Sequence, residues 1–397
     1  MRKLAIYALA LLLATSAFGA SFRAGSPSTT NNDDSCDISV QPAATLLLPY
    51  FEVDFRSPQS QARSTLFTVQ NVSPLPQIAE VTLWTDYAYP GLQFPIFLTG
   101  YDVQSINLYD IFARAVVAPG PTPAGGGTSV RVTVPANPTK GTQPSSNLSN
   151  PNFLSDVSAT CAAIPGTFPP TLLADIQQLF TVGVPVDNAL GCAPPPQTFP
   201  PTASTPVGGT HINAIGYITI DVVATCQTVK PMSKDYFAKN LLYDNVLTGD
   251  YQIITRGDKN YAQGGPMVHI RAVPEGGPAG ASTLTNLPYT FYDRYTTGFF
   301  FNRAVDRRQP LPSTFAPRYI QGGNGGFNTA LRIWREGIVS GDGACSDFIR
   351  NSNMPVTEIV RFDEHENATV STGCPTAVCA PPLGTQTTLS IDTSSQL

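Results

Sequence analysis

The stretch that decides the fold is Ala79-Glu80-Val81-Thr82-Leu83-Trp84-Thr85-Asp86. Its apolar residues at positions 79, 81 and 83 alternate with Glu80 and Thr82, and Trp84 and Asp86 continue the second face. A period of two places successive side chains on opposite faces of a strand. The stretch therefore predicts a β-strand in a half-buried sheet.

The same alternation recurs at 67–70, 106–109, 218–223 and 268–272, and turn residues such as those at 73–76 separate the segments. The 37 prolines and 32 glycines among 397 residues argue against a helical bundle, because both residue types break helices. Short strands divided by turn chemistry are typical of antiparallel sandwiches. We predict an all-β protein with one or two immunoglobulin-like antiparallel sandwiches.

Composition shifts divide the chain into segments. We expect a signal peptide over 1–20, a flexible lead-in over 21–42, a first sandwich over 43–273, a Gly/Pro linker over 274–283, and a second sandwich or a continuation over 284–397. Within the first sandwich, residues 118–209 form an insertion rich in Pro, Gly, Ser and Thr. The stretch from Pro169 to Phe180 has helical spacing there and predicts one short helix.

The N-terminus has the pattern of a secretory signal peptide. Arg2 and Lys3 precede an apolar run from Leu4 to Ala14, and small residues follow that run. No later segment is apolar over a length that would span a bilayer. The formal net charge of −5 gives no electrostatic basis for nucleic-acid binding. We expect a secreted protein, extracellular or periplasmic, without a membrane span.

Seven cysteines follow this segment, and in an exported chain they are first candidates for disulfides. The first expected pair is Cys161 with Cys192, the second is Cys36 with Cys226, and the third is Cys345 with Cys374 or Cys379. No Cys-x-x-Cys is present and no histidine stands at ligand spacing, which disfavours a metal site. The pairing stays open, and the odd cysteine is expected to be free or to form an intermolecular disulfide.

The sequence identifies no catalytic residue. It contains His211, His269 and His365, and it has no Gly-x-Ser-x-Gly motif to supply a nucleophile. His269 alternates with apolar neighbours and is expected on a solvent-facing side of a strand. Nothing near His211 in the sequence suggests a partner.

One acidic segment is a weak candidate for a metal. Asp363, Glu364 and Glu366 follow a predicted strand, and clustered carboxylates are oxygen ligands of the kind Ca²⁺ prefers. Their spacing matches no calcium-binding repeat, so a solvated turn is the favoured interpretation. We expect no metal and no cofactor.

Tyrosine and aspartate occur side by side at seven places: Asp86-Tyr87, Tyr101-Asp102, Tyr109-Asp110, Asp235-Tyr236, Tyr243-Asp244, Asp250-Tyr251 and Tyr292-Asp293. Exposed aromatic rings beside carboxylates could stack on and hydrogen-bond to sugars. The simpler interpretation is that tyrosine packs well in strands while its hydroxyl reaches water. A cell-surface or glycan partner is one hypothesis.

Four segments resemble an uncharacterised group of exported bacterial β-sandwich proteins with no assigned activity. The segments are Ala44 to Asp54, Leu98 to Leu108, Gly216 to Val223 with Cys226, and Phe362 to Glu364. The resemblance implies a secreted bacterial β-sandwich, and it transfers no catalytic residue.

The leading functional hypothesis is a secreted or cell-surface, non-enzymatic binding or structural protein whose ligand is unknown. The alternative is a secreted hydrolase, directed at carbohydrate, that uses paired carboxylates. Such an enzyme needs two carboxyl groups about 5–9 Å apart in a cleft. The sequence does not show which carboxyl groups would pair.

Overall fold

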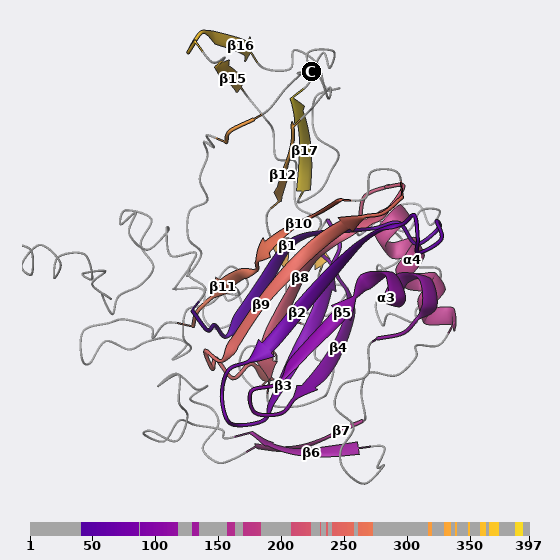
Figure 1. Cartoon of the computed structure of the whole chain (residues 1–397), viewed down its shortest axis with the longest axis vertical. Helices are drawn as coiled ribbons and strands as arrows, with labels where there is room; N and C mark the ends of the chain where they lie inside the picture. The colour runs from indigo at the N-terminus through magenta and orange to yellow at the C-terminus, as the bar shows by residue number, and fades with distance from the viewer. Residues whose placement is uncertain are drawn as a thin grey trace, which may run out of the picture.

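The structure is a computed structural model that describes two β-sheets, two helices and several short hairpins (Figure 1). Backbone and side chains are described within 41–86, 88–117, 170–183, 208–223, 240–257 and 261–272, and at 231, 236, 317–319 and 365–367. Backbone pairing is described for strands at 129–134, 157–162, 329–334, 338–339, 348–349, 358–362, 368–372 and 386–391.

The larger sheet has five antiparallel strands in the order β11-β1-β8-β3-β4. Their bounds are Thr45–Val53 for β1, Gln77–Trp84 for β3, Pro90–Leu98 for β4, Ala214–Val223 for β8 and Val268–Ile270 for β11. The smaller sheet has four antiparallel strands in the order β10-β9-β2-β5. Their bounds are Arg63–Asn71 for β2, Val103–Asn107 for β5, Leu247–Thr255 for β9 and Tyr261–Pro266 for β10. The predicted predominance of antiparallel β structure is confirmed.

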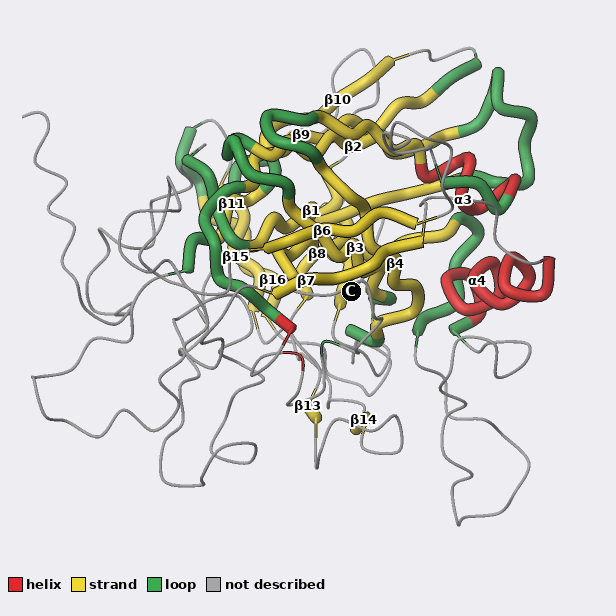
Figure 2. The backbone as a smooth tube through the Cα atoms, turned by 90° about the horizontal axis from the view of Figure 1, so that it is seen from below, coloured by secondary structure: helices red, strands yellow, loops and turns green. Residues whose placement is uncertain are grey.

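The two sheets lie face to face (Figures 1 and 2). Buried side chains from both sheets form one hydrophobic core between them. Leu46 and Leu48 of β1 meet Phe67 and Val69 of β2 in this core, and all four side chains are buried. The chain passes from one sheet to the other between β1 and β2, and again between β2 and β3. Burying the apolar face of each sheet against the other is the main driving force for this arrangement.

The central strands of the larger sheet are buried on both faces. Every residue of β3 and of β8 is buried, including Glu80 and Thr82, which alternation placed on a half-exposed face. The prediction of a half-buried sheet is therefore wrong for these two strands. Strand β6 contacts β3, and Tyr236 bonds to Asp221 of β8, so segments far away in the sequence contribute to this cover.

Two helices close one end of the sandwich. Helix α3, Leu108–Arg114, begins at Asn107, whose side chain accepts a hydrogen bond from the Tyr109 backbone at 3.1 Å. Helix α4, Pro170–Val182, confirms the helix expected in the insertion. Phe112 of α3 and Phe180 of α4 meet edge to face with their ring centroids 5.4 Å apart.

The chain leaves and re-enters this end of the sandwich at one point. Gly183 follows α4 with a φ of 81°, a conformation that favours glycine. A Cβ atom on Gly183 would lie only 1.8 Å from the carbonyl oxygen of Gly208. The two ends of the segment 184–207 are therefore in direct backbone contact.

The remaining described strands form separate two-stranded sheets. They are β6 (Ser129–Val134) with β7 (Val157–Ala162), β12 (Thr329–Trp334) with β17 (Gln386–Ile391), β13 (Ile338–Val339) with β14 (Phe348–Ile349), and β15 (Glu358–Phe362) with β16 (Ala368–Thr372). The division of the chain at 274–283 stays a prediction. Among the described residues, no helix combines the length and apolar character needed to cross a bilayer.

We predict that Gly216→Ala destabilises the sandwich strongly. A Cβ atom at this position would lie 2.1 Å from the carbonyl oxygen of Trp84, so the backbone of β3 or β8 would have to move. We expect a loss of about 2 kcal/mol or more, measured by chemical unfolding. The matched control is Gly265→Ala, where nothing lies within 4 Å of the added methyl group. Equal stability of the two variants would contradict the close packing of β3 against β8.

Candidate functional site

The smaller sheet has an open face that points away from the larger sheet. Along β2 the odd-numbered residues from Thr65 onward are buried, while Thr68 is partly exposed and Gln70 is exposed. Strands β9 and β10 continue this face with Asp250, Gln252 and their neighbours. The prediction of alternating exposure therefore holds for β2 from Thr65 onward, whereas β10 does not alternate. It is wrong at 106–109, where Leu108 and Tyr109 are both buried and begin helix α3.

A shallow groove of about 690 Å³ lies on this part of the smaller sheet. Its lining comprises Thr68, Gln70, residues 248–252, residues 262–266 and His269. The strand register places Thr68 opposite Asp250 and Gln70 opposite Thr248. Side chains of neighbouring strands thus form polar rows across the groove.

The groove presents several hydrogen-bonding side chains and a single carboxylate beside apolar surface. Thr68, Gln70, Thr248 and Gln252 supply hydroxyl and amide groups, each of which can donate and accept hydrogen bonds. Asp250 is exposed and is the one carboxylate among the lining residues. Burial raises the pKa of Tyr251 next to it, so its hydroxyl keeps its proton. Of the seven tyrosine–aspartate pairs, Asp250-Tyr251 is the pair that lies in this groove.

His269 lies beneath the groove and joins the two sheets. It belongs to β11 of the larger sheet, and its Nε2 atom lies 3.2 Å from the Gly249 carbonyl oxygen of β9. Its Nδ1 atom lies 2.9 Å from the backbone oxygen of Gln41. The residue is 5% exposed, so the expectation of a solvent-facing histidine is wrong. The neighbouring apolar residues, Val268 and Ile270, are the partly exposed ones.

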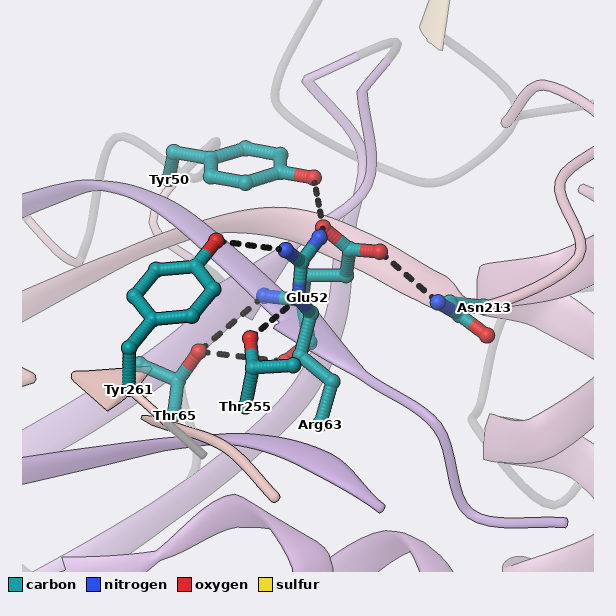
Figure 3. A network of polar contacts seen from close by, with 7 residues as sticks. All are labelled: Tyr50, Glu52, Arg63, Thr65, Asn213, Thr255 and Tyr261. Atoms are coloured by element: carbon teal, nitrogen blue, oxygen red, sulfur yellow. Dashed lines mark hydrogen bonds and ion pairs between the residues drawn. The ribbon is translucent and has the colours of Figure 1, made fainter. Parts of the chain in front are cut away.

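A polar network lies further along the same strands, where β9 ends and β10 begins (Figure 3). The Nη1 atom of Arg63 lies 2.6 Å from Oε2 of Glu52, which connects β2 of the smaller sheet to β1 of the larger sheet. Arg63 also donates to Thr255 at 3.0 Å and to the hydroxyl of Tyr261 at 3.2 Å. We call Glu52, Arg63, Thr255 and Tyr261, with Tyr50 and Asn213, the inter-sheet network.

The network holds Glu52 in its ionised form. Burial alone would raise the pKa of this carboxyl group. The hydrogen bond from Asn213, the positive charge of Arg63 and the hydrogen bond from Tyr50 outweigh burial and hold the pKa below its ordinary value. Both carboxylate oxygens accept hydrogen bonds, at 2.7 Å from Asn213 and 2.9 Å from Tyr50. The site therefore acts as a fixed, satisfied ion pair.

Two buried carboxyl groups lie on neighbouring strands of the larger sheet. Glu80 of β3 and Asp221 of β8 are direct partners in the strand register, and both are 0% exposed. Asp221 accepts hydrogen bonds from Tyr236 at 2.5 Å and from Thr45 at 2.6 Å. Cross-strand partners of this kind have Cβ atoms about 4.5–5.5 Å apart. This pair is close enough for glycosidase chemistry, but it has no access to solvent.

His211 has a partner that the sequence does not reveal. Its Nε2 atom lies 2.8 Å from Oδ2 of Asp86, and the other oxygen of Asp86 accepts from the Gly209 backbone at 2.8 Å. The His211 backbone donates to the Thr181 carbonyl at 2.8 Å. These bonds fasten the chain where it returns from the insertion. Sequence neighbours of His211 give no sign of this partner, because Asp86 lies 125 residues away along the chain.

The predicted metal and disulfide residues lie almost entirely outside the described residues. Asp363 and Glu364 are outside them, whereas Glu366 is exposed and has a φ of 63°. Cys36, Cys192, Cys226, Cys345, Cys374 and Cys379 are also outside them. Cys161 lies in β7, where its backbone pairs with Val130. In the described part of the chain, no three His, Cys, Asp or Glu residues form a metal-binding group.

We predict that Glu52→Gln lowers stability at neutral pH but not in acid. Because the pKa of folded Glu52 is depressed, its contribution is present above the pKa of the unfolded chain and is lost as the pH falls through the lower, folded value. At pH 7 the loss should be about 1–3 kcal/mol by chemical unfolding, and the difference from wild type should shrink toward pH 3. The control is Asp110→Asn, which breaks an exposed pair with Arg114 and should have little effect. A pH-independent difference would show that the charge of Glu52 is unimportant.

We also predict that Tyr236→Phe costs about 1–3 kcal/mol, because it removes one donor from the buried carboxyl group of Asp221. Thermal or chemical unfolding measures this loss. Tyr101→Phe removes a hydroxyl from a residue that is 66% exposed and is the matched control. If both variants unfold like wild type, the bond between Tyr236 and Asp221 contributes nothing to stability.

Comparison with known proteins gives no relative from which a role could be transferred. No protein family model, no curated protein and no solved structure matches the chain.

Proposed function

We propose that this chain is an exported, non-enzymatic binding protein that holds a neutral carbohydrate in the groove of its smaller sheet. The observation that carries the proposal is the lining of that groove. It combines hydroxyl and amide side chains with a single carboxylate, Asp250. Export and the proposed immunoglobulin-like relationship are supported by the sequence pattern alone.

The groove chemistry suits a ligand with many hydroxyl groups. A sugar hydroxyl is both a donor and an acceptor, and Thr68, Gln70 and Gln252 offer both functions in return. Asp250 adds a strong acceptor, since hydrogen bonds to a charged group are about twice as strong as neutral ones. An anionic ligand would meet the charge of Asp250 without a cationic side chain among the lining residues to offset it.

The size and position of the groove also support a role in ligand binding. Small-molecule sites usually measure about 300–1,000 Å³, and this groove lies within that range. It is formed by strands, which hold side chains in fixed positions more firmly than loops do. The contact between His269 of β11 and the Gly249 carbonyl oxygen holds β9, which lines the groove, against the larger sheet.

The alternative function, a secreted hydrolase, has less support. The one pair of opposed carboxyl groups noted above, Glu80 and Asp221, is buried away from the groove. The groove contains Asp250 as its single carboxylate among the lining residues. Acid–base hydrolysis of a glycoside requires two carboxyl groups that flank the substrate. We therefore favour binding without catalysis.

The test is a glycan array of neutral and anionic oligosaccharides, followed by titration calorimetry with the best neutral probe. We expect a neutral oligosaccharide to bind and Asp250→Asn to weaken binding by about tenfold or more, because it replaces a charged acceptor with an amide. The control is Asp110→Asn, an equal change at a partly exposed position on α3, away from the groove lining.

Three results would count against the proposal. They are the absence of binding to any neutral oligosaccharide, binding that Asp250→Asn leaves unchanged, and release of reducing sugar from the bound probe. The last result would favour the hydrolase instead. Unfolding curves of the two variants should overlap with wild type, because Asp250 is exposed and Asp110 forms a partly exposed ion pair of the kind that contributes little to stability.

A further inference from the structure

Each sheet edge presents unpaired backbone groups that can attract another strand, and three of the four edges here are protected. Strand β4 carries Pro90 and Pro95 and contacts helix α4. Strand β11 is three residues long. Strand β5 has five residues and runs directly into helix α3. These are common ways of keeping an edge from pairing.

Strand β10 is the exception. Its six residues, Tyr261–Pro266, are exposed except for one that is intermediate, and none of them is charged. Within the described part of the chain, no strand pairs with its outer side. Pro266 at its end is the single protective residue.

The pairing of β10 with β9 shows which backbone N–H and C=O groups of β10 point toward β9 and which point outward. Met267 donates its backbone N–H to Gly249 of β9, in the same register as the rest of the pair. Alternation along the strand turns the N–H and C=O groups of 263 and 265 toward β9 as well. The groups of Ala262 and Gly264 consequently point outward. Pro266 also faces outward and has no N–H that would need a partner.

We propose that β10 pairs antiparallel with β10 of a second copy of this chain, which joins two four-stranded sheets into one. In this register Ala262 lies opposite Gly264 of the second copy, and Gln263 lies opposite Gln263. Each of the two symmetric Ala262–Gly264 pairs exchanges two hydrogen bonds, so every outward N–H of Ala262 and Gly264 finds a carbonyl.

A second copy fits this edge for two reasons. A strand related to itself by a twofold axis is necessarily antiparallel, as are all the neighbouring strands of this sheet. The edge carries no charge, so two copies meet without like charges facing each other.

The inter-sheet network holds the edge ready for pairing. Tyr261, the first residue of β10, accepts a hydrogen bond from Arg63, and Met267 fastens the other end to Gly249. A Cβ atom at Gly264 would lie 2.0 Å from the carbonyl oxygen of Tyr251, so β10 lies tightly against β9. A strand fixed at both ends loses little further freedom on association.

The test uses the full-length chain and places charges on the twofold axis. Gln263→Lys should weaken dimerisation at least about tenfold, and Gln263→Glu should do the same, because each variant puts like charges face to face. An equimolar mixture of the two variants should restore the dimer as a heterodimer. Sedimentation velocity from about 10 µM to about 1 mM at low ionic strength measures all three samples.

A backbone variant provides a second measurement. Ala262→Pro removes an outward N–H that β9 does not use, so it should abolish the dimer, whereas Ala262→Ser should retain it. Melting curves check that the variants are folded, and if Ala262→Pro does not fold, the Gln263 mixture decides. A monomer at every concentration would overturn the proposal. So would a dimer that survives Gln263→Lys, or a mixture that remains monomeric. None of these results depends on carbohydrate binding.

Discussion

The ion pair between Glu52 and Arg63 is the interaction on which the arrangement of the two sheets most depends. The core between the sheets is apolar and gives no preferred alignment by itself, because hydrophobic contact has no direction. A hydrogen-bonded ion pair does have a direction. Asn213 brings the start of β8 to the same carboxylate, and Tyr261 brings the start of β10 to the same guanidinium group. Four strands are thereby aligned at one end of the sandwich.

Local pattern predicted the strands well because a strand needs little more than alternation. The segments at 67–70, 79–84 and 218–223 all lie in strands, and the helix beginning at Pro170 lies where its spacing placed it. The segment at 106–109 is the exception, because β5 ends at Asn107 and helix α3 begins at Leu108. These features depend on residues that are close in sequence. Local sequence patterns therefore predict the strands and helices but not which strands pair with each other.

The burial of individual side chains is harder to predict from sequence, because it depends on which other segments of the chain pack over a strand. The alternating pattern does not show whether the side chain of Glu80 faces water or is covered by a segment that is distant in sequence. In the structure Glu80 is fully buried. For His269, the apolar neighbours were assigned to the core, whereas the histidine itself points between the sheets. A carboxyl group within an apolar strand, as at Asp221, is the one sequence signal that could have indicated a buried polar site. Asp250 was noted only as one of seven tyrosine–aspartate pairs, and the register alone shows that it shares a groove with Thr68.

The close approach of Gly183 and Gly208 affects how the chain can accommodate insertions and deletions. Since the two glycines touch, the sandwich does not require any particular length of chain between them. Loop-closure entropy rises only slowly with length, so this junction tolerates gain or loss of sequence at small cost to the fold. Segments of different length can therefore be inserted between Gly183 and Gly208. The contact between Asp86 and His211 holds the chain in place where it returns to the sandwich.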